Sequence, residues 1–333
     1  MEASALQTIG KRYTQIDICR GFGIALVVLG HALKQVPTEN SVVVALIAVI
    51  YSFHMPLFFV LAGFTAHQLL CVNKLAERMD YIKKRSKRLL LPYFIMSAIY
   101  IPLKMMMSAY AIRPYDFSQA WRILIGDSPD TLLWFLYVLF LINVLCAIFL
   151  TRKRMSVFLA CSFIITLLTY TMKWELKLTR HLFFFLLGLY GRVLVEEKSQ
   201  ISVWKRWNRG SVIAAACVAF CVGNVLGQHL SDAWFLLTAL GGSYLALVAS
   251  GWIMNRRSGR FWMTLGKYSM DIYLFSDPVM IAVRLIAWNI LRLSATICII
   301  LCFLSSLLLP VFISWAIVRR VSLFRKLFLG MDG

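Results

Sequence analysis

The sequence has little charge, and little of that charge is negative. Only 15% of its 333 residues are charged, and 15 acidic residues face 35 Lys and Arg. A soluble domain has about 25% charged and about 45–50% apolar residues, whereas 60% of this chain is hydrophobic. This balance excludes an ordinary soluble domain and indicates a protein that lies in a lipid bilayer.

The signatures of several functional classes are also missing. No CxxC pair or Cys/His ligand set occurs among the eight cysteines, so we assign no metal site and no disulfide. No glycine-rich nucleotide loop is present, so we expect no ATP coupling and no tightly bound cofactor. No small-residue cleavage pattern follows the first apolar run, which we therefore expect to be retained as a helix.

The positive charge has two interpretations. A nucleic-acid-binding protein gathers Lys and Arg on a folded soluble surface. Here they stand in short clusters between apolar runs, which is the pattern of the positive-inside rule. We therefore expect membrane lipid, and no nucleic acid, among the partners of the chain.

Ten apolar runs have roughly the length that a bilayer-crossing helix needs. The sequence therefore predicts an all-α polytopic membrane protein, built as a single domain over residues 1–333. With the N-terminus in the cytoplasm, 25 Lys and Arg fall on the cytoplasmic side and nine on the outer side, which predicts cytoplasmic N- and C-termini in the inner membrane. The expected spans are about 16–36, 42–70, 89–107, 131–150, 155–172, 181–195, 211–228, 233–254, 264–287 and 294–318.

Three ionisable residues, Asp17, Arg20 and His31, lie in the first run. Such groups are costly in hydrocarbon and are candidate functional residues by default. At about 100° per residue, Arg20 and His31 differ by only about 20° around the helix axis and by about 16 Å along it, and Asp17 shares their face. An interfacial Asp17–Arg20 pair and a structural core histidine would give the same pattern without a function.

The surrounding residues extend this pattern. Residues 16–31, IDICRGFGIALVVLGH, resemble the signature of the acyltransferase-3 family, in which ten residues separate an Arg from a His and an Asp stands three before the Arg. The likeness is strongest to the branch of fucose-4-O-acetylase-like sugar O-acetyltransferases. Four further stretches resemble that branch: 51–64 (YSFHMPLFFVLAGF), 83–93 (KKRSKRLLLPY), 133–136 (LWFL) and 265–275 (LGKYSMDIYLF). The chain departs from the pattern at Ala62, where Ser is usual, and at Ser276, where His is frequent, so no histidine role carries over to position 276.

The resemblance implies a membrane O-acyltransferase that moves an acyl group from cytoplasmic acyl-CoA, with acetyl-CoA as the expected donor substrate. The acceptor would be a sugar hydroxyl of a cell-surface polysaccharide or its lipid-linked precursor. The residues fit this independently, because histidine is well suited to take a hydroxyl proton near neutral pH. We expect His31 to be the general base or to carry a transient acyl group. We expect Arg20 to bind the CoA diphosphate and Asp17 to orient Arg20.

Further candidates each have a structural alternative. His54 precedes Met55 and Pro56, where an interrupted helix frees backbone groups, and is expected to hold the acceptor or polarise the thioester, unless it is a buried structural histidine. Arg85 and Arg88 are candidates for CoA phosphate contacts, although topology and anionic lipid also explain their cluster. Trp134 would stack on a sugar or belong to an aromatic belt.

Asp271 and Asp277 lie in the ninth expected span, where an acid is costly unless a partner neutralises it. We expect Arg284, two turns away, to pair with Asp277 near the outer face, and both are candidate substrate contacts. The sequence names no partner for Asp271. His181, beside Arg180, is a further candidate near an outer site.

The alternative function is a polytopic transporter or flippase for an envelope glycan precursor or a small anion. Asp17, Arg20, His31 and His54 would then line a polar path. Transporters often carry interrupted helices at matching positions in two halves. Only one such helix, at Pro56, is evident in this sequence.

Overall fold

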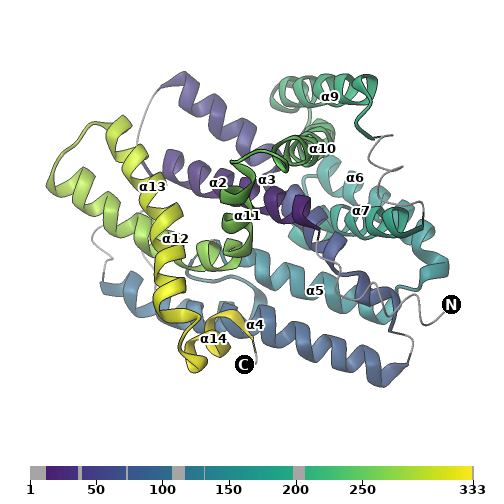
Figure 1. Cartoon of the computed structure of the whole chain (residues 1–333), viewed down its shortest axis with the longest axis horizontal. Coiled ribbons are helices and arrows are strands. Elements are labelled where there is room, and N and C mark those ends of the chain that lie inside the picture. The colour runs from purple at the N-terminus through teal and green to yellow at the C-terminus, as the bar shows by residue number, and fades with distance from the viewer. Residues whose placement is uncertain are drawn as a thin grey trace.

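The computed structural model describes residues 13–36, 40–72, 74–106, 117–130, 132–197 and 207–331. These residues form helices and contain no β-strand (Figure 1). A helix occupies each predicted apolar run. The long helices are α2 (Thr14–Gln35), α3 (Ser41–Thr65), α4 (Leu75–Met106), α5 (Trp134–Phe149), α6 (Met155–Thr171), α7 (Lys177–Glu197), α9 (Gly210–His229), α10 (Phe235–Ile253), α12 (Ser269–Arg284) and α13 (Ala295–Ile313).

Eight helices in the described part of the chain are long and apolar enough to cross a membrane, and α5 is a shorter apolar helix. The predicted class, an all-α multi-pass membrane protein, is therefore confirmed. The total of about ten spans and the cytoplasmic termini stay predictions. The shorter elements include η1 (His67–Leu70), η3 (Phe117–Ile125), α11 (Gly259–Lys267), the π-helical turns η6 (Leu285–Ile290) and η7 (Ser314–Val318), and α14 (Ser322–Leu329).

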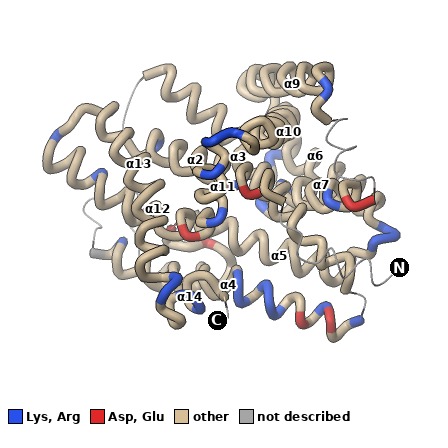
Figure 2. Tube along the Cα trace, viewed as in Figure 1, with Lys and Arg blue, Asp and Glu red and all other residues tan. Residues whose placement is uncertain are grey.

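Two elements differ in length from the expected spans. The second apolar run was expected to continue to residue 70, but α3 ends at Thr65 and is followed by η1. Helix α4 begins 14 residues before the expected third span. The first turns of α4 are rich in charged residues and therefore show no apolar periodicity, so the sequence did not predict a helix there. As a result, the basic cluster 83–88 lies on a helix, and Figure 2 shows basic residues following one another along α4.

Helix α2 lies at the centre of the molecule. It packs against α3, α10, α11, α12 and α13 (Figure 1). Of the eight apolar helices it has the largest buried share, 72% of its most apolar window. Gln15 and Asp17 of α2 are buried among other helices, where hydrogen-bond partners are available, whereas Thr14 and Lys34 near the two ends are exposed.

Helices α3 and α7 pack through glycines. A Cβ at Gly63 would overlap the backbone oxygen of Phe185, and a Cβ at Gly188 would overlap the backbone oxygen of Val60. Small residues let membrane helices approach closely enough for backbone contact. This contact holds α3 against α7 and thereby fixes the position of the histidine on α3.

Replacement of Gly188 by alanine should separate the two helices. Overpacking of this kind costs about 1–3 kcal/mol. We expect the Gly188→Ala variant to have a lower Tm in fluorescence-detected size-exclusion chromatography. Gly210→Ala is the matched control, since a Cβ at Gly210 meets nothing within 4 Å. Equal Tm values for the two variants would contradict this description of the interface.

Candidate active site

A cavity of about 1500 Å³ lies within the described part of the molecule. One end, here called the basic end, is lined by Arg20, Arg85 and Arg88. The other, here called the carboxylate end, is lined by Gln35, Asp130 and Asp277, and also by the basic residues Lys34, Lys104 and Arg284. His31 and His54 also line it. The cavity therefore joins two chemically different ends past two histidines.

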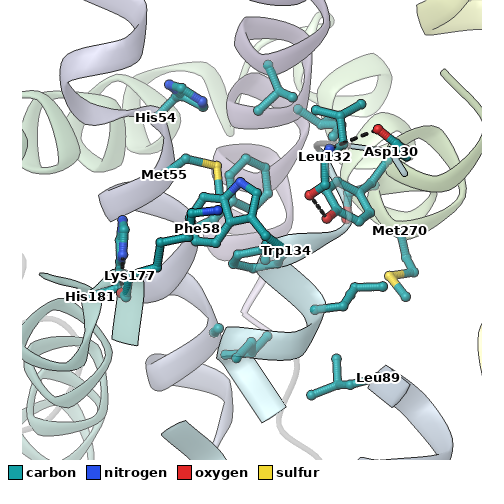
Figure 3. Close-up of a pocket in the computed structure, with 18 of the residues that line it drawn as sticks. His54, Met55, Phe58, Leu89, Asp130, Leu132, Trp134, Lys177, His181 and Met270 are labelled. Carbon is teal, nitrogen blue, oxygen red and sulfur yellow. Dashed lines mark hydrogen bonds between the residues drawn. The ribbon is translucent and has the colours of Figure 1, made fainter. Parts of the chain in front are cut away.

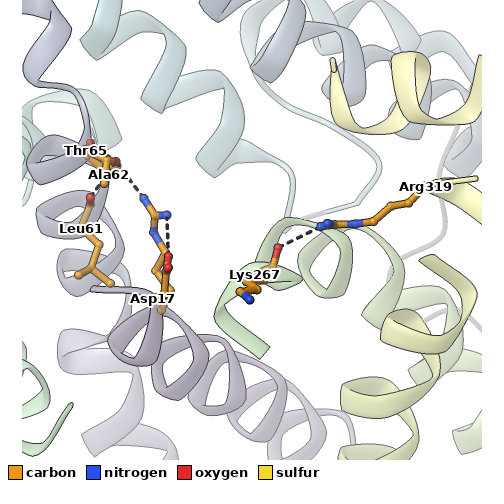
Figure 4. Close-up of polar contacts among 7 residues, drawn as sticks. Asp17, Leu61, Ala62, Thr65, Lys267 and Arg319 are labelled. Carbon is orange, nitrogen blue, oxygen red and sulfur yellow. Dashed lines mark hydrogen bonds and ion pairs between the residues drawn. The ribbon is translucent and has the colours of Figure 1, made fainter. Parts of the chain in front are cut away.

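Arg20 is held from two helices at the basic end. Its Nη1 lies 3.9 Å from Asp17 Oδ1 on the same helix, and its Nη2 donates to Thr65 Oγ1 of α3 at 2.9 Å. Figure 4 shows Asp17 and Thr65 approaching from the two sides. The structure thus brings Asp17 beside Arg20, as the spacing predicts, and the proposed orienting role stays a prediction. Thr65 was missed, because nothing in its local sequence distinguishes it.

Arg85 and Arg88 lie one turn apart on α4 and complete the basic end. Arg85 Nε donates to Tyr81 Oη at 2.9 Å, and Tyr81 Oη donates to Asn143 Oδ1 of α5 at 2.6 Å. Both arginines lie near enough to act electrostatically on Arg20. Three guanidinium groups therefore gather at one opening, which favours an anionic ligand with several phosphate groups. Their contact with CoA stays a prediction.

His31 and His54, on different helices, are joined by Tyr51. Tyr51 Oη lies 3.4 Å from His31 Nδ1, and the ring of Tyr51 meets the ring of His54 edge-on with centroids 4.9 Å apart. His54 Nδ1 lies 2.7 Å from the backbone oxygen of Ile50. A carbonyl oxygen only accepts hydrogen bonds, so Nδ1 of His54 carries the ring proton. In the neutral ring, Nε2 can then accept a hydrogen bond. We call His31, Tyr51 and His54 the histidine row. No role for Tyr51 was predicted.

Trp134 belongs to a packed aromatic group in the cavity wall. The rings of Trp134 and His181 have centroids 5.3 Å apart, and the Lys177 ammonium lies 5.0 Å from the Trp134 ring centroid. His181 Nδ1 lies 2.7 Å from the backbone oxygen of Lys177, and its ring stacks 4.5 Å from that of Phe59. Figure 3 shows Trp134, His181 and Lys177 close to His54 around the cavity. Since Lys177 occupies one indole face, sugar stacking there would need this ammonium to move, and it stays a prediction.

The predicted pairing of Asp277 with Arg284 does not form a close ion pair among the described residues, although Arg284 is near enough to act electrostatically on Asp277. Asp277 Oδ1 instead accepts from Gln35 Nε2 at 2.9 Å, and Arg284 Nε has no hydrogen-bond partner among the described residues. Residues seven apart are about 10 Å apart along a helix, whereas side chains meet at three or four residues. Both residues nevertheless line the cavity, so their candidacy as substrate contacts stays a prediction.

Asp271 has a partner that the sequence did not reveal. Arg319 Nη2 lies 2.7 Å from Asp271 Oδ2, and Ser314 Oγ donates to Asp271 Oδ1. Arg319 also donates to the Lys267 backbone oxygen at 3.0 Å, which Figure 4 shows. This ion pair connects α12 with the residue that ends η7 and lies outside the cavity lining.

Asp130, which no sequence pattern marked as a candidate, also lines the cavity. It is 3% exposed, and its Oδ1 accepts from the Leu132 backbone N–H at 2.8 Å. Figure 3 shows Asp130 and Leu132 joined in this way beside the cavity. The second oxygen, Oδ2, is buried without a hydrogen-bond partner among the described residues. Burial, and then the nearby Asp277 carboxyl, raise the pKa of Asp130 to about 8.

Comparison with known proteins agrees with the cavity's chemistry. The model of a family described as an acyltransferase domain, acyltransferase-3, matches residues 13–317. The chain is 28% identical over 215 residues to nodulation protein NolL of Sinorhizobium fredii, a match that covers 61% of this chain. It spans about 56% of the length of that relative. No solved structure matches the chain. The chain therefore belongs to the acyltransferase-3 family and is a multi-pass membrane protein.

Proposed function

We propose that this acyltransferase moves acetyl from acetyl-CoA to a hydroxyl of an envelope glycan sugar or its lipid-linked precursor. The observation that carries the proposal is one cavity that contains three arginines at its basic end, Asp130 and Asp277 at its carboxylate end, and His31 and His54 between them. The basic end would face the cytoplasm of a cell with the protein in its inner membrane, where acetyl-CoA is available. The bacterial origin of NolL supports that location.

The three arginines of the basic end would bind the phosphates of CoA, since a planar guanidinium forms paired, charge-assisted hydrogen bonds with such oxygens. Arg20 and His31 are about 16 Å apart along the α2 axis. The extended pantetheine arm would span this interval and bring the thioester to the histidine row. Asp17 and Thr65 would keep Arg20 fixed, so that little side-chain entropy is lost when the donor binds.

At the histidine row, the acceptor oxygen attacks the thioester carbonyl while His31 takes the hydroxyl proton. The tetrahedral intermediate then collapses, the C–S bond breaks, and the imidazolium returns the proton to the CoA thiolate. His54 would accept a hydrogen bond from the acceptor through its free Nε2. The neutral ring cannot donate from that atom, so of the two roles expected for His54 the geometry favours holding the acceptor over polarising the thioester.

Membership of an acyltransferase family leaves no observation that favours the transporter or flippase alternative. A gene deletion in the source organism tests the proposal. Membranes that carry the protein should transfer labelled acetyl from acetyl-CoA to envelope glycan extracted from the deletion strain. Membranes without the protein should not. Failure of the protein-containing membranes to label that glycan, while the protein is folded, would refute the proposed reaction.

A further inference from the structure

We propose that Gln35, Asp130 and Asp277 form the subsite that binds the acceptor sugar through two of its neighbouring hydroxyl groups. The inference rests on the proposed function, because it says where the acceptor lies and what recognises it. The three residues come from three separate elements and line the same end of the cavity.

The position of Gln35 connects this subsite with the proposed base. Gln35 follows His31 by four residues on α2, so the two side chains share a face and are separated by one turn, about 6 Å. A sugar ring held at Gln35 would therefore place a hydroxyl next to His31. Arg20, which would hold the donor, is about three turns away from His31 on the same helix.

Two oxygen atoms of the subsite are buried without partners. The amide nitrogen of Gln35 donates to Asp277 Oδ1, which leaves Gln35 Oε1 unpaired. Asp130 Oδ1 is used by the Leu132 N–H, which leaves Asp130 Oδ2 unpaired. A buried, unpaired polar atom carries a desolvation penalty, which a ligand that supplies hydrogen bonds would remove. Sugar hydroxyl groups supply the donor that Gln35 Oε1 lacks, and they can either donate to Asp130 Oδ2 or accept from it, beside the Tyr100 hydroxyl that also faces this carboxyl.

The residues at the carboxylate end provide the subsite with both hydrogen-bond donors and hydrogen-bond acceptors. Asp130 faces Asp277 and Tyr273 of α12 and Tyr100 and Lys104 of α4. Lys104 donates to the backbone oxygen of Pro129. Burial and the neighbouring Asp277 carboxyl raise the pKa of Asp130 to about 8, so the two carboxyl groups hold a proton between them at neutral pH and can donate through it. Gln35 Oε1 and the unprotonated carboxyl oxygens accept. A pair of sugar hydroxyls, each a donor and an acceptor, matches this arrangement.

Steady-state kinetics on the purified full-length protein test the subsite. The acceptor probe is envelope glycan from the deletion strain and the donor is labelled acetyl-CoA. Gln35→Leu should raise the KM for glycan at least about tenfold and change the KM for acetyl-CoA less than about twofold. Asn224→Leu is the matched control, because its Oδ1 is also buried without a partner but the residue does not line the cavity. An unchanged glycan KM in Gln35→Leu would overturn the inference and leave the proposed function intact, whereas no transfer by the wild type would overturn the proposed function.

A pH series provides a second test that does not depend on the folding of Gln35→Leu. The proton that Asp130 and Asp277 hold between them is retained at neutral pH and is lost as the pH rises past the raised pKa of Asp130, about 8, which leaves two carboxylates side by side. The wild-type glycan KM should therefore rise between pH 7 and 9.5, and the KM of Asp130→Asn, which cannot ionise, should not rise with it. A wild-type glycan KM that does not change with pH, or the same rise in Asp130→Asn, would contradict a subsite that binds the sugar through the carboxyl proton.

Discussion

The His31→Ala variant is expected to lose about 10²- to 10⁴-fold in kcat, the usual contribution of a general base. The KM for acetyl-CoA should change little, because the donor phosphates would be bound about 16 Å away at Arg20. His31 lines the cavity and its Nδ1 faces Tyr51, so its removal eliminates the base without disturbing the basic end. The measurement is acetyl transfer to glycan from the deletion strain.

His229→Ala is the control for this prediction. His229 is exposed at the end of α9 and does not line the cavity, so its loss should leave kcat unchanged. His54→Ala should act mainly on the KM for glycan, since its free Nε2 would hold the acceptor. A folded His31→Ala protein that keeps more than a tenth of the wild-type kcat would show that another group takes the proton.

The Arg20→Ala variant should raise the KM for acetyl-CoA by about 10- to 150-fold. Hydrogen bonds to charged groups contribute about 1.5–3 kcal/mol, and about 1.4 kcal/mol corresponds to a factor of ten. Arg20 is the member of the basic end that two neighbours fix in place, Asp17 at 3.9 Å and Thr65 at 2.9 Å. Initial rates at varied acetyl-CoA would measure the change.

Arg154→Ala is the matched control for Arg20, because Arg154 is an exposed arginine outside the cavity lining. Arg20→Lys should recover only part of the donor affinity, since an ammonium keeps the charge but lacks the planar fork. An Arg20→Ala protein with an unchanged KM for acetyl-CoA would place the donor phosphates elsewhere in the molecule.

The helices and the polar face of α2 could be predicted because they depend on local periodicity. The apolar runs gave the helices, and the spacing of Asp17, Arg20 and His31 placed them on one face. The contacts that cavity residues make with other helices could not be predicted, because the partners come from distant segments. Thr65 is 45 residues from Arg20, and Gln35 is 242 residues from Asp277.

Asp130 and Tyr51 illustrate a different limit. Asp130 follows a proline in a loop with other acids, and a sequence pattern does not show which acid of a loop folds inward. Tyr51 belongs to the stretch 51–64 that resembles the family, but its position between His31 and His54 depends on how α2 packs against α3. The Asp277–Arg284 pairing failed for a local reason, because seven residues exceed the reach of helix neighbours.

The central claim is that one cavity takes the donor from the basic end and the acceptor from the carboxylate end. Sealed proteoliposomes test this directly, with labelled acetyl-CoA outside and glycan fragments from the deletion strain trapped inside. The account predicts label in the trapped glycan, and no label there with His31→Ala. Label that appears only when donor and glycan share one compartment would contradict a cavity that serves the two substrates from opposite ends.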